Sequence, residues 1–264
     1  MESPSSGALQ NIAKWGFSMF DDGRYKNIVV DLINSIETTQ YDSIGKAGLL
    51  IWQSLSNEGV LHVFSTGHSH MIAEELFYRA GGLIQVNPIF DPNLMLHEGA
   101  IKSTALERLP GYAEALFDTV EFRKGEPIII MSNSGINVVP IEMAVLAKKH
   151  GMKVIAVTSI SISSMLEPRH PSGIKLMDVG DVVIDNCIKD GDAVLELPNM
   201  GQKVGAVSSI AAIYIAQKIV LGVINEFIKN DQVPPVFMSA NIPGGDEHNA
   251  KLVKKYKKKI RNLY

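Results

Sequence analysis

Cysteine is almost absent from this 264-residue chain, which contains only Cys187. One cysteine cannot form an internal disulfide, and a single unpaired thiol is typical of proteins kept in a reducing compartment. Excess charge is also absent, because the formal net charge is -3 and the pI is about 6.2. This balance gives no reason to expect nucleic acid or an anionic membrane as a partner. We therefore predict a cytoplasmic protein that binds neither.

The pattern of a signal peptide or of a membrane-spanning segment is also not found in this sequence. Its first 20 residues have no basic region followed by an apolar run, so we expect no signal peptide. The longest apolar stretch, residues 206–224, contains Ser208, Ser209, Gln217 and Lys218. A membrane span of about 20 residues would rarely carry that much polarity. We interpret this stretch as a buried core helix.

Two nucleotide-binding fingerprints are missing. No G-x-x-x-x-G-K-[ST] run occurs, which argues against a P-loop nucleotidase. No G-x-G-x-x-G follows the first predicted strand, so the usual dinucleotide site is absent as well. We expect no cofactor.

Short apolar runs alternate with helical stretches along the chain. Buried strands are predicted at residues 60–64, 127–131, 153–157 and 182–185. Helices are predicted within 25–57, at 71–79, at 138–150 and at 208–229, with Asn137 as a cap and Gly151 as a stop. Strand, polar loop, helix and strand in this order form the βαβ unit. The fold class is therefore α/β, with a doubly wound parallel sheet in an α-β-α sandwich and helical extensions at both ends.

We predict one main domain, at residues 25–250, because no repeat or long linker divides the chain. An N-terminal extension at 1–24 precedes it, and a basic amphipathic helix at 251–264 follows it. The lysine face of that helix is interpreted as solvated, with a nucleic-acid or membrane patch as the alternative. Residues 83–110 are rich in proline and weakly periodic, which is typical of a functional or mobile segment.

Polar residues directly follow three of the predicted strands, where an open parallel sheet binds its ligands. They are Ser65, Thr66, Gly67, His68 and Ser69 after the first strand, Ser132, Asn133, Ser134 and Gly135 after the second, and Thr158 and Ser159 after the third.

A phosphate monoester fits these loops chemically. Hydroxyls and the N–H groups at a helix N-terminus donate to phosphate oxygens, and the helix dipole favours the negative charge. Glycine lets the backbone approach the ligand closely. The alternative is that these residues only form turns and helix caps. Three such loops at neighbouring strand ends favour the anion site.

The loops VFSTGHSH and MSNSG resemble the two phosphate-binding loops of the sugar isomerase (SIS) domain. The longer blocks NPIFDPNLMLHEG, RHPSG, GDAVLE and SANIPGGDEHN resemble an uncharacterised bacterial family of SIS-domain proteins, over roughly residues 25–264. The resemblance implies a flavodoxin-like fold, a phosphorylated sugar as ligand and a homodimer. The resemblance also implies which residues surround the phosphate: Ser65, Ser69, Ser132, Ser134 and Thr158.

The chemistry of phosphosugars in this family is mostly proton transfer, which needs a base and an acid. Our first candidate is Glu98, which lies beside His97 in the irregular segment; an ion pair with Lys102 or Arg108 is the alternative. His248 is the second, since a C-terminal residue completes a neighbouring subunit's site in some SIS isomerases; the alternative is an exposed position in a helical turn capped by Asp246. Further candidates are His68, His70, His170, Glu196, Asp246 and Glu247.

Three functions stay open at this point. The first is an isomerase acting on a phosphosugar, with a phosphosugar lyase or etherase as its variant. The second is a non-catalytic sensor, and the third is a scaffold without a small-molecule site.

The histidines near Glu98 lack the fixed spacing of a metal motif, so we predict no metal site. His62, inside a strand, is interpreted as a hydrogen-bonded core histidine.

Overall fold

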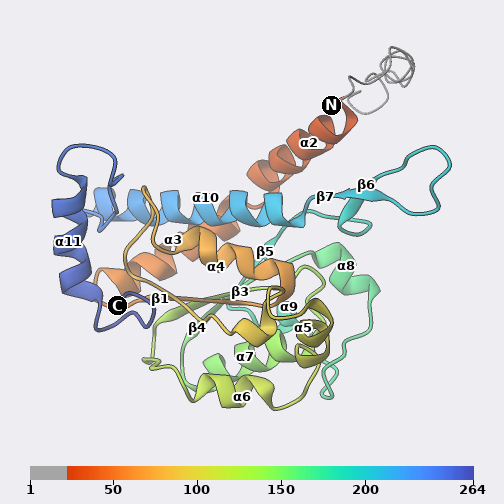
Figure 1. Cartoon of the computed structure of the whole chain (residues 1–264), viewed down its shortest axis with the longest axis horizontal. Coiled ribbons are helices and arrows are strands. Elements are labelled where there is room, and N and C mark those ends of the chain that lie inside the picture. The colour runs from red at the N-terminus through yellow and green to blue at the C-terminus, as the bar shows by residue number, and fades with distance from the viewer. Residues whose placement is uncertain (1–22) are drawn as a thin grey trace, which may run out of the picture.

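A five-stranded parallel sheet forms the centre of the computed structural model, which describes residues 23–264 (Figure 1). Its strands are β1 (Leu61–Ser65), β2 (Val86–Pro88), β3 (Pro127–Met131), β4 (Lys153–Thr158) and β5 (Val182–Asp185). The strand order β2-β1-β3-β4-β5 is that of the flavodoxin-like, doubly wound sheet. The predicted fold class is therefore confirmed. Residues 1–22 of the predicted N-terminal extension at 1–24 lie outside the described part of the chain.

Helices cover both faces of the sheet. They are α2 (Arg24–Thr39), α3 (Tyr41–Leu55), α4 (Met71–Leu76), α5 (Ala100–Leu106), α6 (Tyr112–Phe117), α7 (Val138–Lys149), α8 (Ile160–Met165), α9 (Leu176–Val179), α10 (Ser208–Lys229) and α11 (Gly245–Tyr256), with 3-10 turns η2 (Gly67–His70) and η3 (Pro92–Leu94). One core joins α3, α4 and α10 to the sheet, and the other joins α6, α7 and α9 to its opposite face. The N-terminal helix α2 projects from this body beside the hairpin of β6 (Ala193–Leu195) and β7 (Val204–Ala206) (Figure 1).

The central strands are buried on both sides, which explains their continuous apolar runs. Side chains alternate along β3, so that Ile129 joins the core under α10 while Ile128 and Ile130 join the core over α7. All five residues of β3 are buried. A parallel sheet with two covered faces leaves its strand ends as the places where a ligand can bind.

Helix α10 corresponds to the apolar stretch interpreted as a core helix. Among the described residues it is the one helix long and apolar enough to cross a membrane by length and composition. Its apolar residues instead supply much of one core, including Ile215, Ile219 and Val223, all fully buried against the sheet and α3.

Several local expectations need correction. The irregular segment contains the edge strand β2 and helix α5, which its prolines had obscured. The side chain of Asn137 does not cap α7; its Oδ1 accepts a hydrogen bond from Arg169 instead. The C-terminal helix occupies Gly245–Tyr256 and not 251–264, and residues 257–264 continue without helix.

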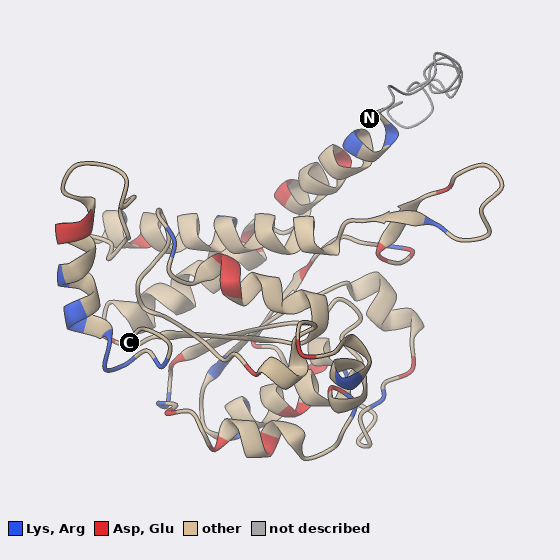
Figure 2. Ribbon diagram, viewed as in Figure 1, with Lys and Arg blue, Asp and Glu red and all other residues tan. Residues whose placement is uncertain are grey.

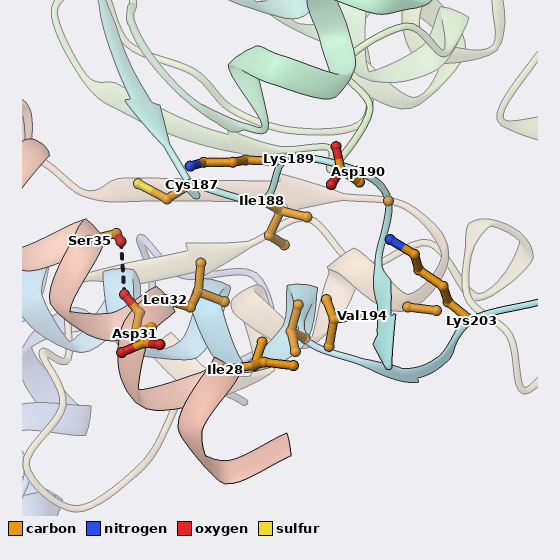
Figure 3. Close-up of a pocket in the computed structure, with 13 residues that line it drawn as sticks. Ile28, Asp31, Leu32, Ser35, Cys187, Ile188, Lys189, Asp190, Val194 and Lys203 are labelled. Atoms are coloured by element: carbon orange, nitrogen blue, oxygen red, sulfur yellow. Dashed lines mark hydrogen bonds between the residues drawn. The ribbon is translucent and has the colours of Figure 1, made fainter. Parts of the chain in front are cut away.

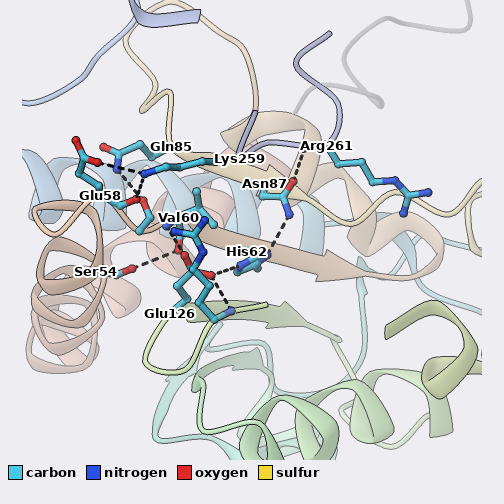
Figure 4. A network of polar contacts seen from close by, with 11 residues as sticks. Ser54, Glu58, Val60, His62, Gln85, Asn87, Glu126, Lys259 and Arg261 are labelled. Carbon is cyan, nitrogen blue, oxygen red and sulfur yellow. Dashed lines mark hydrogen bonds and ion pairs between the residues drawn. The ribbon is translucent and has the colours of Figure 1, made fainter. Parts of the chain in front are cut away.

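The C-terminal segment 257–264 closes the amino-terminal edge of the sheet (Figure 4). The backbone N–H of Arg261 donates to Asn87 Oδ1 at 2.9 Å, and the Asn87 amide contacts His62 Nδ1 at 3.1 Å. His62 Nε2 lies 3.0 Å from Glu126 Oε2, so its interpretation as a hydrogen-bonded core histidine is confirmed. Burial alone would raise the pKa of Glu126, but the hydrogen bonds from His62 and two backbone N–H groups hold that pKa below its usual value.

Lysines are prominent on α11 and the segment after it, next to this amino-terminal edge (Figure 2). Lys255 and Lys259 both lie 3.4 Å from the carboxylate of Glu58. Tyr256, Ile260 and Leu263 are buried on the inner side. The basic charge thus belongs to the outer face of a docked segment.

Candidate functional site

The polar loops after β1, β3 and β4 meet at the carboxyl-terminal edge of the sheet. In the parallel register Ser65 pairs with Met131, and Met131 pairs with Val157. The strands therefore end side by side, and the loops that follow them are neighbours, as the sequence predicts. This edge is opposite the one closed by the C-terminal segment.

The loop after β3 forms a tightly held turn. Ser132 Oγ accepts from the N–H of Gly135 at 3.2 Å, and the carbonyl of Asn133 accepts from the N–H of Ser159 at 3.0 Å. Gly135 has a φ of +65°, and a Cβ at this position would lie 2.7 Å from Thr158 Oγ1. Glycine is therefore required both by conformation and by space.

The amide of Asn133 is oriented by Asn186, which follows β5. Asn186 Oδ1 accepts from the N–H of Ile188, so its amide nitrogen is the donor to Asn133 Oδ1, at 2.7 Å. The nitrogen of Asn133 then remains as a donor without a partner among the described residues. Sequence reasoning missed Asn186, although its position directly after a strand was the available signal.

Four of the predicted ligand hydroxyls use their hydrogen inside the fold. Ser65 donates to the Met131 carbonyl, Thr66 to the Glu107 carboxylate, Thr158 to the Asn133 carbonyl, and Ser159 to the Ile188 carbonyl. Ser159 also caps α8, because its Oγ accepts from the N–H of Ile162 at 3.0 Å. These residues shape the loops, and they can meet a ligand only through groups other than these hydrogens.

Three hydroxyls keep their hydrogen available. Ser69 and Ser134 make no side-chain hydrogen bond within residues 23–264, and Ser132 acts only as an acceptor there. All three lie on the loops after β1 and β3. Together with the Asn133 amide they form a set of neutral donors at the strand ends, which suits an anionic oxygen.

Ser163 and Lys175 border this turn; Ser163 is among the hydroxyls that the sequence places after the third strand, and Lys175 was missed. Ser163 is fully buried and its Oγ has no hydrogen-bond partner. A Cβ on Gly135 would lie 3.1 Å from that Oγ. Lys175 Nζ donates to the Ser163 carbonyl and so brings a positive charge beside the loop. Lys175 is distant from the strand in sequence, and no local pattern would have pointed to it.

The first loop places a histidine between two acceptors. His70 Nδ1 contacts the Gly67 carbonyl, and His70 Nε2 lies 3.2 Å from Glu74 Oε1. Both ring nitrogens of His70 therefore face an acceptor oxygen. His68 in the same loop is exposed.

Glu98, the first candidate for proton transfer, and its neighbour His97 lie near this loop. The His97 ring centroid is 6.2 Å from that of His70. The Glu98 side chain is 54% exposed, and its carboxylate lies 3.9 Å from Lys102 Nζ, the ion pair that was its alternative interpretation. Their roles stay predictions.

His248 does not join the loops within one chain. It lies on α11 at the amino-terminal edge, where its Nε2 contacts the Val236 carbonyl at 2.9 Å. Asp246 and Glu247 share this helix, Glu196 is exposed after β6, and His170 contacts Ser172 in the loop before α9. The strand-end loops therefore gather His68, His70, His97 and Glu98 and leave the remaining candidates elsewhere.

A separate cavity of about 210 Å³ lies between α2, the loop after β5 and the β6–β7 hairpin (Figure 3). Its apolar wall includes Leu32, Ile188 and Val194, and its charged groups are two lysines and two aspartates. Burial raises the pKa of the Cys187 thiol at one end of it. Balanced charge makes this cavity a poorer phosphate site than the strand-end loops.

Metal ligands do not cluster in the described part of the chain. No group of three or more His, Cys, Asp or Glu side chains there is arranged to hold a metal ion.

Comparison with known proteins agrees with this architecture. Residues 24–159 match the family model of the SIS domain. A UPF0309 protein of Caldanaerobacter subterraneus subsp. tengcongensis is 47% identical over 234 residues, which cover 88% of this chain and 95% of the relative. A UPF0309 protein of Listeria innocua is 41% identical over 236 residues, covering 89% and 96% of the two chains.

Among solved structures, a phosphoheptose isomerase from Francisella tularensis superposes with a TM-score of 0.52. Its sequence identity is 14%, and the match covers 79% of this chain and 98% of that one. At this identity the likeness concerns the fold alone. The family match and the identity to the bacterial relatives together establish that this chain belongs to the SIS-domain family and, within it, to the UPF0309 proteins.

Proposed function

We propose that this protein binds a phosphorylated sugar at the carboxyl-terminal edge of its sheet and acts on it by proton transfer. The observation that carries the proposal is the set of available donors on the loops after β1 and β3, namely Ser69, Ser132, Ser134 and the Asn133 amide. The ammonium of Lys175 adds positive charge nearby. A phosphate dianion needs donors and positive potential of this kind.

The preferred reaction is aldose–ketose isomerisation in the cytoplasm, as part of carbohydrate metabolism. A phosphosugar lyase or etherase would use the same phosphate loops and also begin with proton removal. A non-catalytic phosphosugar sensor would use the loops alone. Glu98, His97 and His248 stay predictions for the acid and base, with His248 dependent on a neighbouring subunit of a homodimer.

A thermal-shift screen against phosphorylated sugars tests the binding site. A ligand at 100 times its Kd adds about 2.7 kcal/mol to the free energy of unfolding, which is an easily measured shift. We expect Ser134→Ala to lose most of that shift, because one available donor disappears. Ser35→Ala is the matched control, since Ser35 lines the separate cavity between α2 and the loop after β5.

Either variant can contradict the proposal. A shift that survives in Ser134→Ala and disappears in Ser35→Ala would move the ligand to the cavity of Figure 3. No shift with any phosphosugar would remove the proposed function. Binding without turnover of any bound sugar would favour the sensor over the isomerase.

A further inference from the structure

Glu107 lies beside the strand-end loops and was absent from the sequence candidates. It directly follows α5, where its N–H donates to the Ser103 carbonyl at 2.9 Å. Its own carbonyl accepts from the N–H of Val139 at 3.0 Å, in the first turn of α7. The main chain of Glu107 is thus fixed between the end of α5 and the helix that follows the second loop.

The Glu107 side chain reaches the first loop. Thr66 Oγ1 donates to Glu107 Oε2 at 2.8 Å, and Thr66 is buried directly after β1. The other oxygen, Oε1, has no hydrogen-bond partner within residues 23–264. No Lys, Arg or His nitrogen in that range lies within ion-pair distance of either oxygen. One oxygen is therefore held in place and the other is open.

Other carboxylates near these loops are engaged. Both oxygens of Glu142 accept from the N–H of Gly111, at 2.9 and 3.0 Å. Glu74 is paired with His70, and Glu98 is exposed near Lys102. A base must have an unprotonated oxygen without a competing partner and a fixed position next to the ligand. Glu107 meets both requirements.

We propose that Glu107 is the base that moves the substrate proton, an inference that rests on the proposed phosphosugar function. The Glu107 carboxylate removes a proton from the carbon beside the substrate carbonyl, and the released electron pair forms the C=C bond of an enediol. The π electrons of the carbonyl move to its oxygen, which takes up the proton that the adjacent hydroxyl loses as it becomes the new carbonyl, so that each oxygen stays on its own carbon. The Glu107 carboxylic acid then returns its proton to the former carbonyl carbon, so no oxidant, reductant or co-reactant is consumed.

The Thr66 hydrogen bond has a defined part in this step. It holds Oε2 in place and leaves Oε1 free to accept the proton of a ligand bound at the loops. A purely structural role, in which Glu107 only ties α5 to the first loop, would need the hydrogen bond to Thr66 but no charge. Gln at this position keeps an acceptor for Thr66 and removes the base, which separates the two roles.

The test measures proton exchange directly. Wild type, Glu107→Gln, Glu107→Asp and the control Glu142→Gln, whose carboxylate is engaged by the N–H of Gly111, are incubated in D2O with fructose 6-phosphate, ribose 5-phosphate and N-acetylglucosamine 6-phosphate. Loss of the carbon-bound proton is followed by NMR, and binding of each sugar is followed by thermal shift. We expect Glu107→Gln to keep the ligand-induced shift and to lose exchange by about 100-fold or more, the usual contribution of a positioned base. Glu107→Asp should recover part of it, and Glu142→Gln should stay within about threefold of wild type.

The outcomes separate this inference from the proposed function. Exchange in Glu107→Gln within threefold of wild type, with binding intact, would overturn the inference and leave the proposed function standing. Absence of binding by the wild-type chain would overturn the proposed function. Binding without exchange in wild type would overturn the proton-transfer step and Glu107 as its base. If Glu107→Gln did not fold, exchange by Glu107→Asp equal to that of the control Glu142→Gln would still count against the inference.

Discussion

Gly135 is the residue at which conformation and space act together. Its φ of +65° is unfavourable for any side chain, and an added Cβ would meet Thr158 Oγ1 at 2.7 Å and Ser163 Oγ at 3.1 Å. We expect Gly135→Ala to lower the free energy of unfolding by about 1–3 kcal/mol and to abolish the phosphosugar-induced thermal shift, because the turn that presents Ser134 must open. Urea unfolding and the thermal-shift assay measure the two effects.

Gly81 provides the matched control for this substitution. Its φ is +81°, but nothing lies within 4 Å of the Cβ that an alanine would add. Gly81→Ala should therefore show only the cost of the left-handed backbone and leave ligand binding unchanged. Equal stability of the two variants, with binding intact in Gly135→Ala, would contradict the role given to the turn.

At the residue scale, the sequence located the loops but not every residue that borders them. The Ser-x-Ser-Gly turn was found because glycine and hydroxyl residues directly follow an apolar strand. Lys175 and Glu107 were missed because they are brought to the loops by α9 and α5, and nothing in their local sequence distinguishes them from surface charges. Ser159 was assigned to the ligand although its hydroxyl caps α8 and donates to a carbonyl, and the sequence cannot tell these two uses apart.

At the scale of elements, the C-terminal segment stabilises the amino-terminal edge of the sheet. Ile260 and Leu263 are 1% and 7% exposed and pack with Val60 and Tyr256. Burying a Leu or Ile side chain contributes about 1.5–3 kcal/mol. Removing residues 259–264 should therefore lower the free energy of unfolding by about 3 kcal/mol or more, because the partners of both side chains become exposed.

Chemical denaturation measures this change, and removal of Tyr264 alone is the control. Tyr264 is fully exposed, so its deletion should leave the unfolding midpoint unchanged. The longer deletion also frees Asn87, whose Oδ1 accepts from Arg261, and thereby loosens the contact between Asn87 and His62 (Figure 4). An unfolding midpoint equal to that of wild type would mean that the segment is not part of the stable fold.

Elements were predictable in proportion to their burial and length. The central strands β3 and β4 were placed correctly because both of their faces are covered, which requires an unbroken apolar run. The edge strand β2 was missed, since its three residues include Asn87 and Pro88 and pair on one side only. The helix expected at 251–264 shifted to Gly245–Tyr256, because burial of Ile260 and Leu263 by an irregular segment imitates helical spacing.

At the scale of the whole molecule, exposed apolar side chains gather on the outer face of α3 and α10. Tyr41, Leu49 and Leu221 are 74%, 40% and 58% exposed and line one groove between these helices. Gly45 and Gly222 also line this groove and place no side chain in it. Apolar side chains gathered in one place on a surface mark interaction sites more often than scattered ones do. This face is our candidate for the interface of the proposed homodimer.

Leu221→Glu tests the homodimer at this face. In a symmetric dimer each interface residue occurs once on each subunit, so Leu221→Glu would place two unpaired carboxylates in an apolar contact. The dissociation constant of the dimer should therefore rise by at least about tenfold. Sedimentation velocity over a range of concentrations measures that constant. Val233→Glu is the control, since Val233 is 90% exposed in the segment after α10 and lies outside the groove. A wild-type chain that sediments as a monomer at micromolar concentration would remove the homodimer, and with it any role for His248 in a neighbouring site. A dimer that Leu221→Glu leaves intact would keep the assembly and place its interface on another face.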